Sequence, residues 1–122
     1  IRDVDQLDIK RISQKLRTVS KLCRELKIDK KEFFGGSMTI SSLGGIGGTF
    51  FTPIINAPEL SILGVGKSYD KVIKKDGQII TRKILPISLS YDHRFIDGAE
   101  GARFCVHLSQ SLGKKFAFKL AV

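Results

Sequence analysis

The chain has 122 residues, of which 42% are hydrophobic and 27% are charged, a composition typical of one globular domain that excludes a disordered tail. It has no apolar run of the roughly 20 residues that a bilayer-spanning helix needs, so we expect no membrane partner. The net charge of +9 suggests nucleic acid at first. The basic residues are dispersed among acidic ones without an interleaved aromatic platform, however, and this disfavours a nucleic-acid partner.

Further features indicate the cellular compartment of the protein and whether the sequence is part of a longer one. Its cysteines, Cys23 and Cys105, lie far apart and form no disulfide framework, which favours a reducing cytoplasm. The charged first eight residues lack the apolar stretch of a signal peptide. Because the sequence begins with Ile1 and not with methionine, we expect a piece of a longer protein.

The first predicted element is a helix over residues 9–26, because apolar residues recur there every three or four positions. This stripe consists of Ile9, Ile12, Leu16, Val19, Cys23 and Leu26. Asp5 and Asp8 offer acceptors and negative charge at the helix start. Asp29 and Glu32 have the spacing of a capping box, which predicts a short helical turn before Gly35.

Strands follow the helical part. Residues 38–43 and 60–65 are predicted strands, and eight of the twelve glycines lie in residues 35–66. A hairpin is predicted around Asp76 and Gly77, a strong turn signal. A further strand is predicted over residues 83–91, with Pro86 implying an edge position or a bulge.

The last predicted element is a helix that begins after Gly98 and runs to about Leu112. Its buried side is expected to hold Ala102, Cys105, Leu108 (or Ser109) and Leu112. The sequence shows no internal repeat and no linker, so residues 1–122 are interpreted as a single α+β unit.

Few residues could carry chemistry. His93 follows the end of a predicted strand, and a neutral imidazole can accept a proton from a thiol near neutral pH. Spacing alone nevertheless favours a surface or hydrogen-bonded histidine. A metal site is disfavoured, because only Cys105 and His107 are close and a two-residue spacing places them on different helix faces.

Three motifs, in the same order along the chain, resemble those of a known protein family. The segment SYDHRFIDGA at residues 90–99 resembles the His-x-x-x-Asp-Gly signature of the dihydrolipoyl acyltransferases, the core subunits of 2-oxo acid dehydrogenase complexes. Residues 35–44 and 52–66 resemble two further blocks of the same family, in the same order. The residues in these blocks are most similar to those of the bacterial pyruvate dehydrogenase branch of the family. That similarity implies that the transferred group is acetyl and that the protein is in a bacterial cytoplasm.

The resemblance implies a fold and roles for three residues. The fold would be α+β and chloramphenicol acetyltransferase-like, a mixed sheet flanked by helices, with this chain as the C-terminal half of the catalytic domain and so an incomplete domain. His93 would be the base that deprotonates a thiol, and Ser41 would donate to the tetrahedral oxyanion. Asp97 would hold the loop through an ion pair with an arginine, although its spacing to Glu100 also fits a helix cap. Arg94 is expected to be structural.

The resemblance also implies substrates and partners. The substrates would be coenzyme A and lipoamide carried on a lipoyl domain that this chain lacks, without a metal. A homotrimer would build a larger cubic or dodecahedral core that binds decarboxylase and dihydrolipoyl dehydrogenase subunits. The chain alone is expected to be inactive. Two alternatives stay open, a non-catalytic assembly module that keeps the fold and a succinyl or branched-chain acyltransferase.

Overall fold

The computed structural model describes residues 1–113 and 116. They form two compact units, Ile1–Gly36 with the described residues from Ser111 onward, and Ser37–Gln110. Whether residues 1–122 form the single unit expected from the sequence stays a prediction. Within the described part, no helix is long and apolar enough to cross a membrane.

The first unit is helical, with elements η1 (Val4–Gln6), α1 (Ile9–Arg24) and η2 (Lys30–Phe33). The helix α1 begins where the Asp8 side chain accepts a hydrogen bond from the N–H of Arg11 at 2.7 Å, as the sequence predicts. It ends earlier than expected, because Leu26 has a left-handed φ of 54° and the N–H of Lys27 donates back to the carbonyl of Leu22. Leu26 is therefore outside the helix and 91% exposed.

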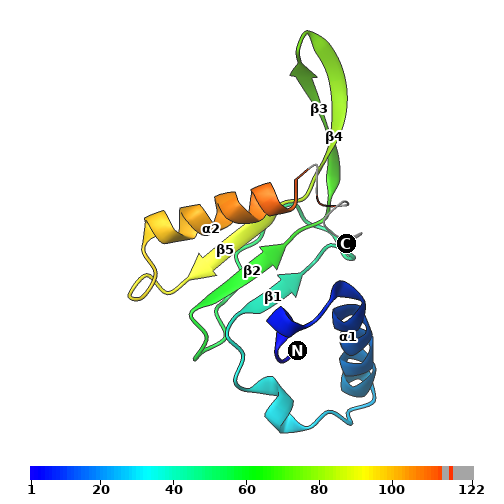
Figure 1. The fold of residues 1–122 in the computed structure, drawn as a ribbon, viewed down its shortest axis with the longest axis vertical. Coiled ribbons are helices and arrows are strands. Elements are labelled where there is room, and N and C mark those ends of the chain that lie inside the picture. The colour runs from blue at the N-terminus through cyan, green and yellow to red at the C-terminus, as the bar shows by residue number, and fades with distance from the viewer. Residues whose placement is uncertain (114–115, 117–122) are drawn as a thin grey trace. The chain divides into compact units, whose positions relative to one another are not determined.

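The second unit is built on a mixed three-stranded sheet in the order β1 (Thr39–Ser42), β2 (Ser61–Val65), β5 (Ile87–Tyr91). The strand β2 runs parallel to β1 and antiparallel to β5, and Figure 1 shows the helix α2 (Gly98–Ser111) lying along one face of this sheet. Among the described residues, the buried aliphatic side chains are Ile62 and Leu63, both on β2, and Pro53 and Pro86 are buried as well. The core of this unit is therefore the central strand.

The register assigns each residue to a face of the sheet. Ser41 pairs with Gly64, which pairs with Ser88, so these three residues share one face. The ring of Phe51 covers that face, because a Cβ built on Gly64 would lie 3.0 Å from its Cζ atom. The opposite face carries Ser61 and meets α2.

The buried side of α2 differs from the prediction. Gly101 is buried, and Cys105 and Leu108 are partly buried, whereas Ala102 and Leu112 are exposed. The prediction for Ala102 was wrong by a small rotation of the helix, and Leu112 lies beyond the helix, which ends at Ser111. Gly101 packs closely on Tyr91 of β5 and occupies the centre of the contact between helix and sheet. A search for apolar periodicity misses it, because glycine is not counted as an apolar residue.

A two-stranded hairpin of β3 (Tyr69–Lys75) and β4 (Gln78–Ile84) projects from the sheet (Figure 1). The predicted turn is confirmed, since Asp76 and Gly77 both have positive φ, 51° and 79°. The single strand predicted over residues 83–91 was wrong. The chain leaves the hairpin after Ile84 and enters the sheet at Ile87, and Pro86 between them uses its carbonyl to accept from the N–H of Gly66.

The glycine-rich segment folds back against the end of β2. The carbonyl of Gly48 accepts a hydrogen bond from the N–H of Lys67 at 2.9 Å. A Cβ on Gly66 would lie only 2.2 Å from the backbone oxygen of Thr49. This glycine is needed for the close approach of two backbones.

That contact predicts the effect of two matched substitutions. Gly66→Ala should lower the free energy of unfolding by about 1–3 kcal/mol, because backbone must move to admit the methyl group. Gly45→Ala is the control, since nothing lies within 4 Å of the position of its Cβ. Thermal unfolding of the purified protein measures both. Equal melting temperatures for the two variants would contradict the packing of the glycine-rich segment.

Candidate active site

The loop after β5 is a tight turn that contains His93. The N–H of Asp92 donates to the carbonyl of Leu60 at 2.9 Å, and the Asp92 carbonyl accepts from the N–H groups of Phe95 and Ile96, both at 3.0 Å. The Asp92 carboxylate also accepts from the N–H of Arg94 at 3.0 Å, across His93. Four hydrogen bonds of one residue therefore fix the backbone on both sides of His93.

The turn is closed by an ion pair between Asp92 and Arg94. The Arg94 Nε atom lies 2.9 and 3.1 Å from the two carboxylate oxygens, and its Nη2 atom lies 2.6 Å from Oδ2. Hydrogen bonds from the Arg94 side chain, then from its backbone, lower the pKa of Asp92 from 3.8 to about 2. The guanidinium also lies 5.7 Å from the centre of the Phe95 ring, a cation–π distance. Arg94 is structural, as expected.

Asp92 is a residue that the sequence analysis missed. It is the partner that holds the loop, whereas the sequence analysis looked for this role at Asp97. An aspartate two residues before an arginine, directly after a strand, has the spacing of a side-chain turn, and that signal could have identified it.

His93 is exposed, and its ring lies beside that of Tyr91. The centres of the Tyr91 and His93 rings are 5.7 Å apart, with an angle of 40° between the planes. An imidazole at the end of a strand, held by a rigid turn and open to solvent, can reach a reactant.

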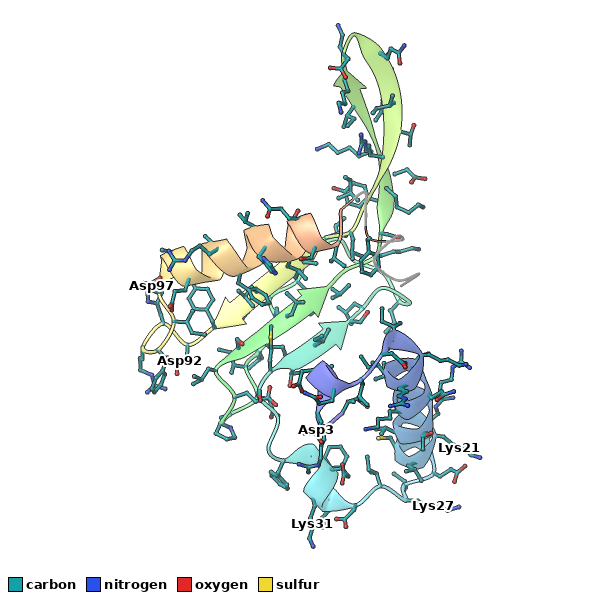
Figure 2. All side chains as sticks on the ribbon, viewed as in Figure 1. Asp3, Lys21, Lys27, Lys31, Asp92 and Asp97 are labelled. Atoms are coloured by element: carbon teal, nitrogen blue, oxygen red, sulfur yellow. The ribbon has the colours of Figure 1, made fainter. Side chains whose placement is uncertain are left out.

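Asp97 begins α2. Its side chain accepts a hydrogen bond from the N–H of Glu100 at 2.7 Å, and its carbonyl accepts from the N–H of Gly101 at 3.1 Å. The helix-capping alternative is therefore confirmed, and an ion pair of Asp97 with an arginine stays a prediction. Figure 2 labels Asp92 and Asp97 on the same loop, where they hold its two ends.

Ser41 lies elsewhere in the unit. It is on β1, partly buried, on the face that α2 does not cover. Two strand spacings separate it from β5, and Asp92 is four residues beyond its register partner Ser88, which together give about 16 Å between the Cα atoms of Ser41 and Asp92. In Figure 1 the chain beyond β5 curves away from β1 into α2.

The structure therefore does not bring Ser41 and His93 together within one chain. Tyr91, which contacts the His93 ring, packs against α2 on the opposite face of the sheet from Ser41. The two residues are therefore far apart and on opposite faces of the sheet. A reaction that needs both must take them from different copies of the chain.

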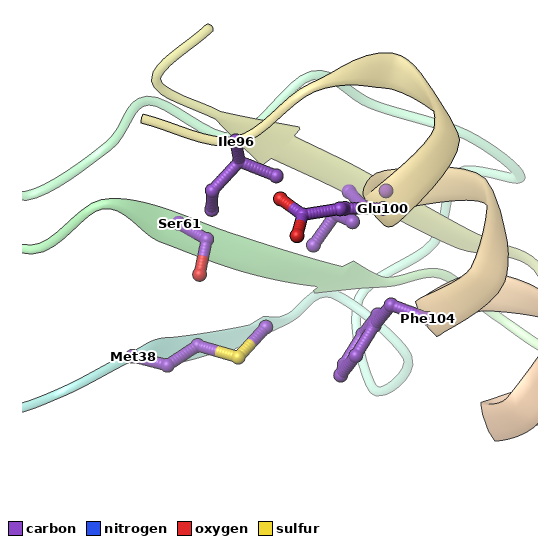
Figure 3. A pocket seen from close by; sticks show the side chains of 7 residues that line it. Met38, Ser61, Ile96, Glu100 and Phe104 are labelled. Carbon is purple, nitrogen blue, oxygen red and sulfur yellow. The ribbon is translucent and has the colours of Figure 1, made fainter. Parts of the chain in front are cut away.

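A pocket of about 230 Å³ lies between α2 and the sheet. It is lined by Met38, Ser61, Leu89, Ile96, Glu100, Gly101 and Phe104. Figure 3 shows the Glu100 carboxylate pointing into this mainly apolar space. None of the three predicted site residues lines it. Among residues 1–113 and 116, no group of three His, Cys, Asp or Glu side chains could hold a metal ion.

The sequence and the fold agree with one family. Residues 1–117 match the 2-oxoacid dehydrogenases acyltransferase (catalytic domain), so the chain belongs to this family. The dihydrolipoyllysine-residue acetyltransferase component of the pyruvate dehydrogenase complex of Cupriavidus necator is 51% identical to it over 112 residues. That match covers 92% of this chain and 20% of that protein. The resemblance seen in the sequence motifs is confirmed.

Two solved structures share the fold. The dihydrolipoamide acetyltransferase of Azotobacter vinelandii matches with a TM-score of 0.89 at 45% identity, and the cubic core of a pyruvate dehydrogenase multienzyme complex matches with 0.89 at 44%. Each match covers 96% of this chain and 48% of the solved chain. The predicted chloramphenicol acetyltransferase-like α+β fold is confirmed. The chain spans about half of these cores and about a fifth of the relative from Cupriavidus necator.

The Asp92–Arg94 pair predicts a dependence of stability on pH. Because the pKa of Asp92 is lowered from 3.8 to about 2, the pair stabilises the folded protein above pH 3.8, and this contribution is lost as the pH falls through about 2. Arg94→Gln should therefore lower the melting temperature at pH 7, by a difference that shrinks below pH 4.

The matched control is Lys83→Gln, which removes the cation of the exposed pair between Lys83 and Asp70 on the hairpin. This change should affect the melting temperature less, because exposed single-contact pairs contribute little. Calorimetry between pH 7 and pH 3 measures both variants. A difference between wild type and Arg94→Gln that grows towards low pH would contradict the pair's role.

Proposed function

We propose that the protein to which this chain belongs transfers an acetyl group between dihydrolipoamide and coenzyme A, as a core subunit of a pyruvate dehydrogenase complex. The observation that carries the proposal is the exposed His93 imidazole, held in a rigid turn at a strand end, in a chain 51% identical to an acetyltransferase component. Acetyl is preferred over succinyl and branched-chain groups because the similar relatives are named as acetyltransferases of that complex.

The residue spacing supports the assignment of roles. The study of the Azotobacter vinelandii enzyme concerns one serine, one histidine and one asparagine in its catalytic mechanism. There the serine precedes the histidine by 52 positions and the asparagine follows it by four. Positions 41 and 93 of this chain are also 52 apart, and position 97 is an aspartate. We therefore assign these roles to Ser41, His93 and Asp97.

The role of Asp97 follows from what aspartate and asparagine share. Both offer a side-chain oxygen that caps a helix, as Asp97 does at 2.7 Å, whereas only aspartate could take a proton or hold an ion pair. Asp97 thus orients the loop between His93 and α2 and does not transfer a proton.

The chemistry uses His93 and Ser41 in one sequence of steps. The His93 imidazole takes the proton of the coenzyme A thiol, and the thiolate forms a bond to the carbonyl carbon of acetyl-dihydrolipoamide. The Ser41 hydroxyl donates a hydrogen bond to the resulting oxyanion, an interaction typically worth about 10²–10³ in rate. When the carbon–sulfur bond to dihydrolipoamide breaks, the imidazolium returns its proton to the leaving thiolate. Acetyl-coenzyme A and dihydrolipoamide result.

The site is complete only in an oligomer. One chain keeps Ser41 and His93 on opposite faces about 16 Å apart at the backbone, so the serine must come from a neighbouring copy. The uncharged residues 35–58 are suited to that interface, since Ile46, Phe50 and Ile54 are 87%, 67% and 89% exposed in the single chain.

The assembly we propose is a trimer that builds a hollow core. A cubic core is described for one solved relative with a TM-score of 0.89. The decarboxylase and dihydrolipoyl dehydrogenase subunits and a lipoyl domain outside this chain would complete the reaction cycle, in a bacterial cytoplasm. Because Ser41 and His93 must come from two copies, we expect a single unassembled copy of this chain to be inactive.

The first test of this function removes the base. His93→Ala in the full-length protein should lower kcat by about 10²–10⁴, since the thiol loses its proton acceptor. His107→Ala is the matched control, because this second histidine is also exposed but lies on α2, away from the turn. Steady-state acetyl transfer measures both variants. The mechanism fails if His93→Ala retains near wild-type turnover.

The second test asks whether the site is shared. Full-length Ser41→Ala and His93→Ala proteins are mixed under conditions that exchange subunits, and each is inactive alone. Random exchange in a trimer pairs an intact Ser41 with an intact His93 at about a quarter of the interfaces, so about a quarter of the activity should return. Ser42→Ala, which changes the neighbouring hydroxyl on the other face of β1, should be active without mixing. No recovery despite proven exchange would place both residues in one chain.

A further inference from the structure

Gly101 is in the interior of α2, where glycine destabilises a helix by about 0.5–1 kcal/mol relative to alanine. Its backbone conformation does not require glycine, since its φ is not positive. A Cβ at this position would lie 2.8 Å from Cε1 and 3.1 Å from Cζ of Tyr91. The glycine therefore makes room for the Tyr91 ring.

The Tyr91 ring joins α2 to His93. One part of the ring rests on the backbone of Gly101, and the ring as a whole lies 5.7 Å from the imidazole, tilted by 40°. That distance and tilt are within the range of favourable aromatic pairs. A ring seated on a helix backbone has little room to move, and the imidazole lies beside it.

The Asp92 turn and Tyr91 fix different parts of His93. Hydrogen bonds of Asp92 to Arg94, Phe95 and Ile96 fix the backbone of the turn. They do not fix the two side-chain torsions of His93, and the Tyr91 ring is the aromatic neighbour that lies beside the imidazole. Holding a general base in one orientation matters because a misplacement of about 1 Å can reduce a rate by about 10²-fold.

We propose that Tyr91, seated on Gly101, is a positioning residue that sets the orientation of the His93 imidazole. The inference rests on the proposed function, in which His93 is the base. Tyr91 acts through the face of its ring and not through its hydroxyl. Gly101 acts through the space that it leaves for that ring.

Four variants of the full-length assembled protein test the inference. Tyr91→Leu removes the ring, Tyr91→Phe keeps the ring and removes only the hydroxyl, and Gly101→Ala adds a methyl group under the ring. Ala102→Ser adds one heavy atom at the next position of α2, which is exposed, and is the matched control. Sedimentation confirms assembly of each variant, and kinetics are normalised to assembled protein.

The expected pattern separates orientation from binding. Tyr91→Leu and Gly101→Ala should each lower kcat by about 10- to 100-fold, with KM for coenzyme A within about twofold of wild type. Tyr91→Phe should stay within about threefold, and Ala102→Ser should match wild type. Adding Gly101→Ala to Tyr91→Leu should cause no further loss, because the ring that the methyl group displaces is already gone.

Two results would overturn the inference. One is wild-type kcat in Tyr91→Leu, which decides the matter even if Gly101→Ala does not assemble. The other is a Gly101→Ala effect of the same size with and without the Tyr91 ring. The proposed function is tested separately by His93→Ala: if that variant is inactive while Tyr91→Leu is fully active, only the positioning role fails.

Discussion

The register of the central strand β2 determines where every other feature of the sheet unit lies. It pairs in parallel with β1 and antiparallel with β5, and it holds the buried side chains of Ile62 and Leu63. A slip of one residue would exchange the faces of the strand and put a side chain where Gly64 leaves room for the Phe51 ring, so the packing of Phe51 opposes that slip. The positions of Ser41 and of the His93 turn follow from this register.

The same register explains why one chain can hold all three proposed site residues and still lack a complete site. The parallel pairing places Ser41 in the middle of one outer strand, and the antiparallel pairing sends the chain to His93 at the far end of the other. The face that holds Ser41 is not the face that α2 covers. If the reaction uses both Ser41 and His93, as we propose, the geometry of one chain requires a second copy.

Much of the local structure could be predicted from the sequence. The helix α1 and its cap at Asp8 follow from periodicity and side-chain chemistry, and the hairpin turn follows from Asp76 and Gly77. These signals act over a few residues, so they do not depend on the rest of the fold. The roles of Ser41 and His93 came from the resemblance to a family and not from their spacing.

Features that depend on tertiary contact could not be predicted. Pro86 divides what looks like one strand, because Ile84 before it pairs with Tyr69 of the hairpin and Ile87 after it pairs with Val65 of the sheet. The buried side of α2 is centred on Gly101, which a hydrophobic pattern does not count, because the contact depends on the Tyr91 ring. The separation of Ser41 from His93 needed the pairing of three strands, which no single segment encodes.

A crystal structure of the complete assembled core tests the central claim most directly, through the distances between the Ser41 Oγ atom and the His93 imidazole nitrogens. The account predicts that the shortest of these distances joins two different chains and that the distance within a chain is longer. A shortest distance within one chain, close enough for both residues to contact the same thioester, would contradict it.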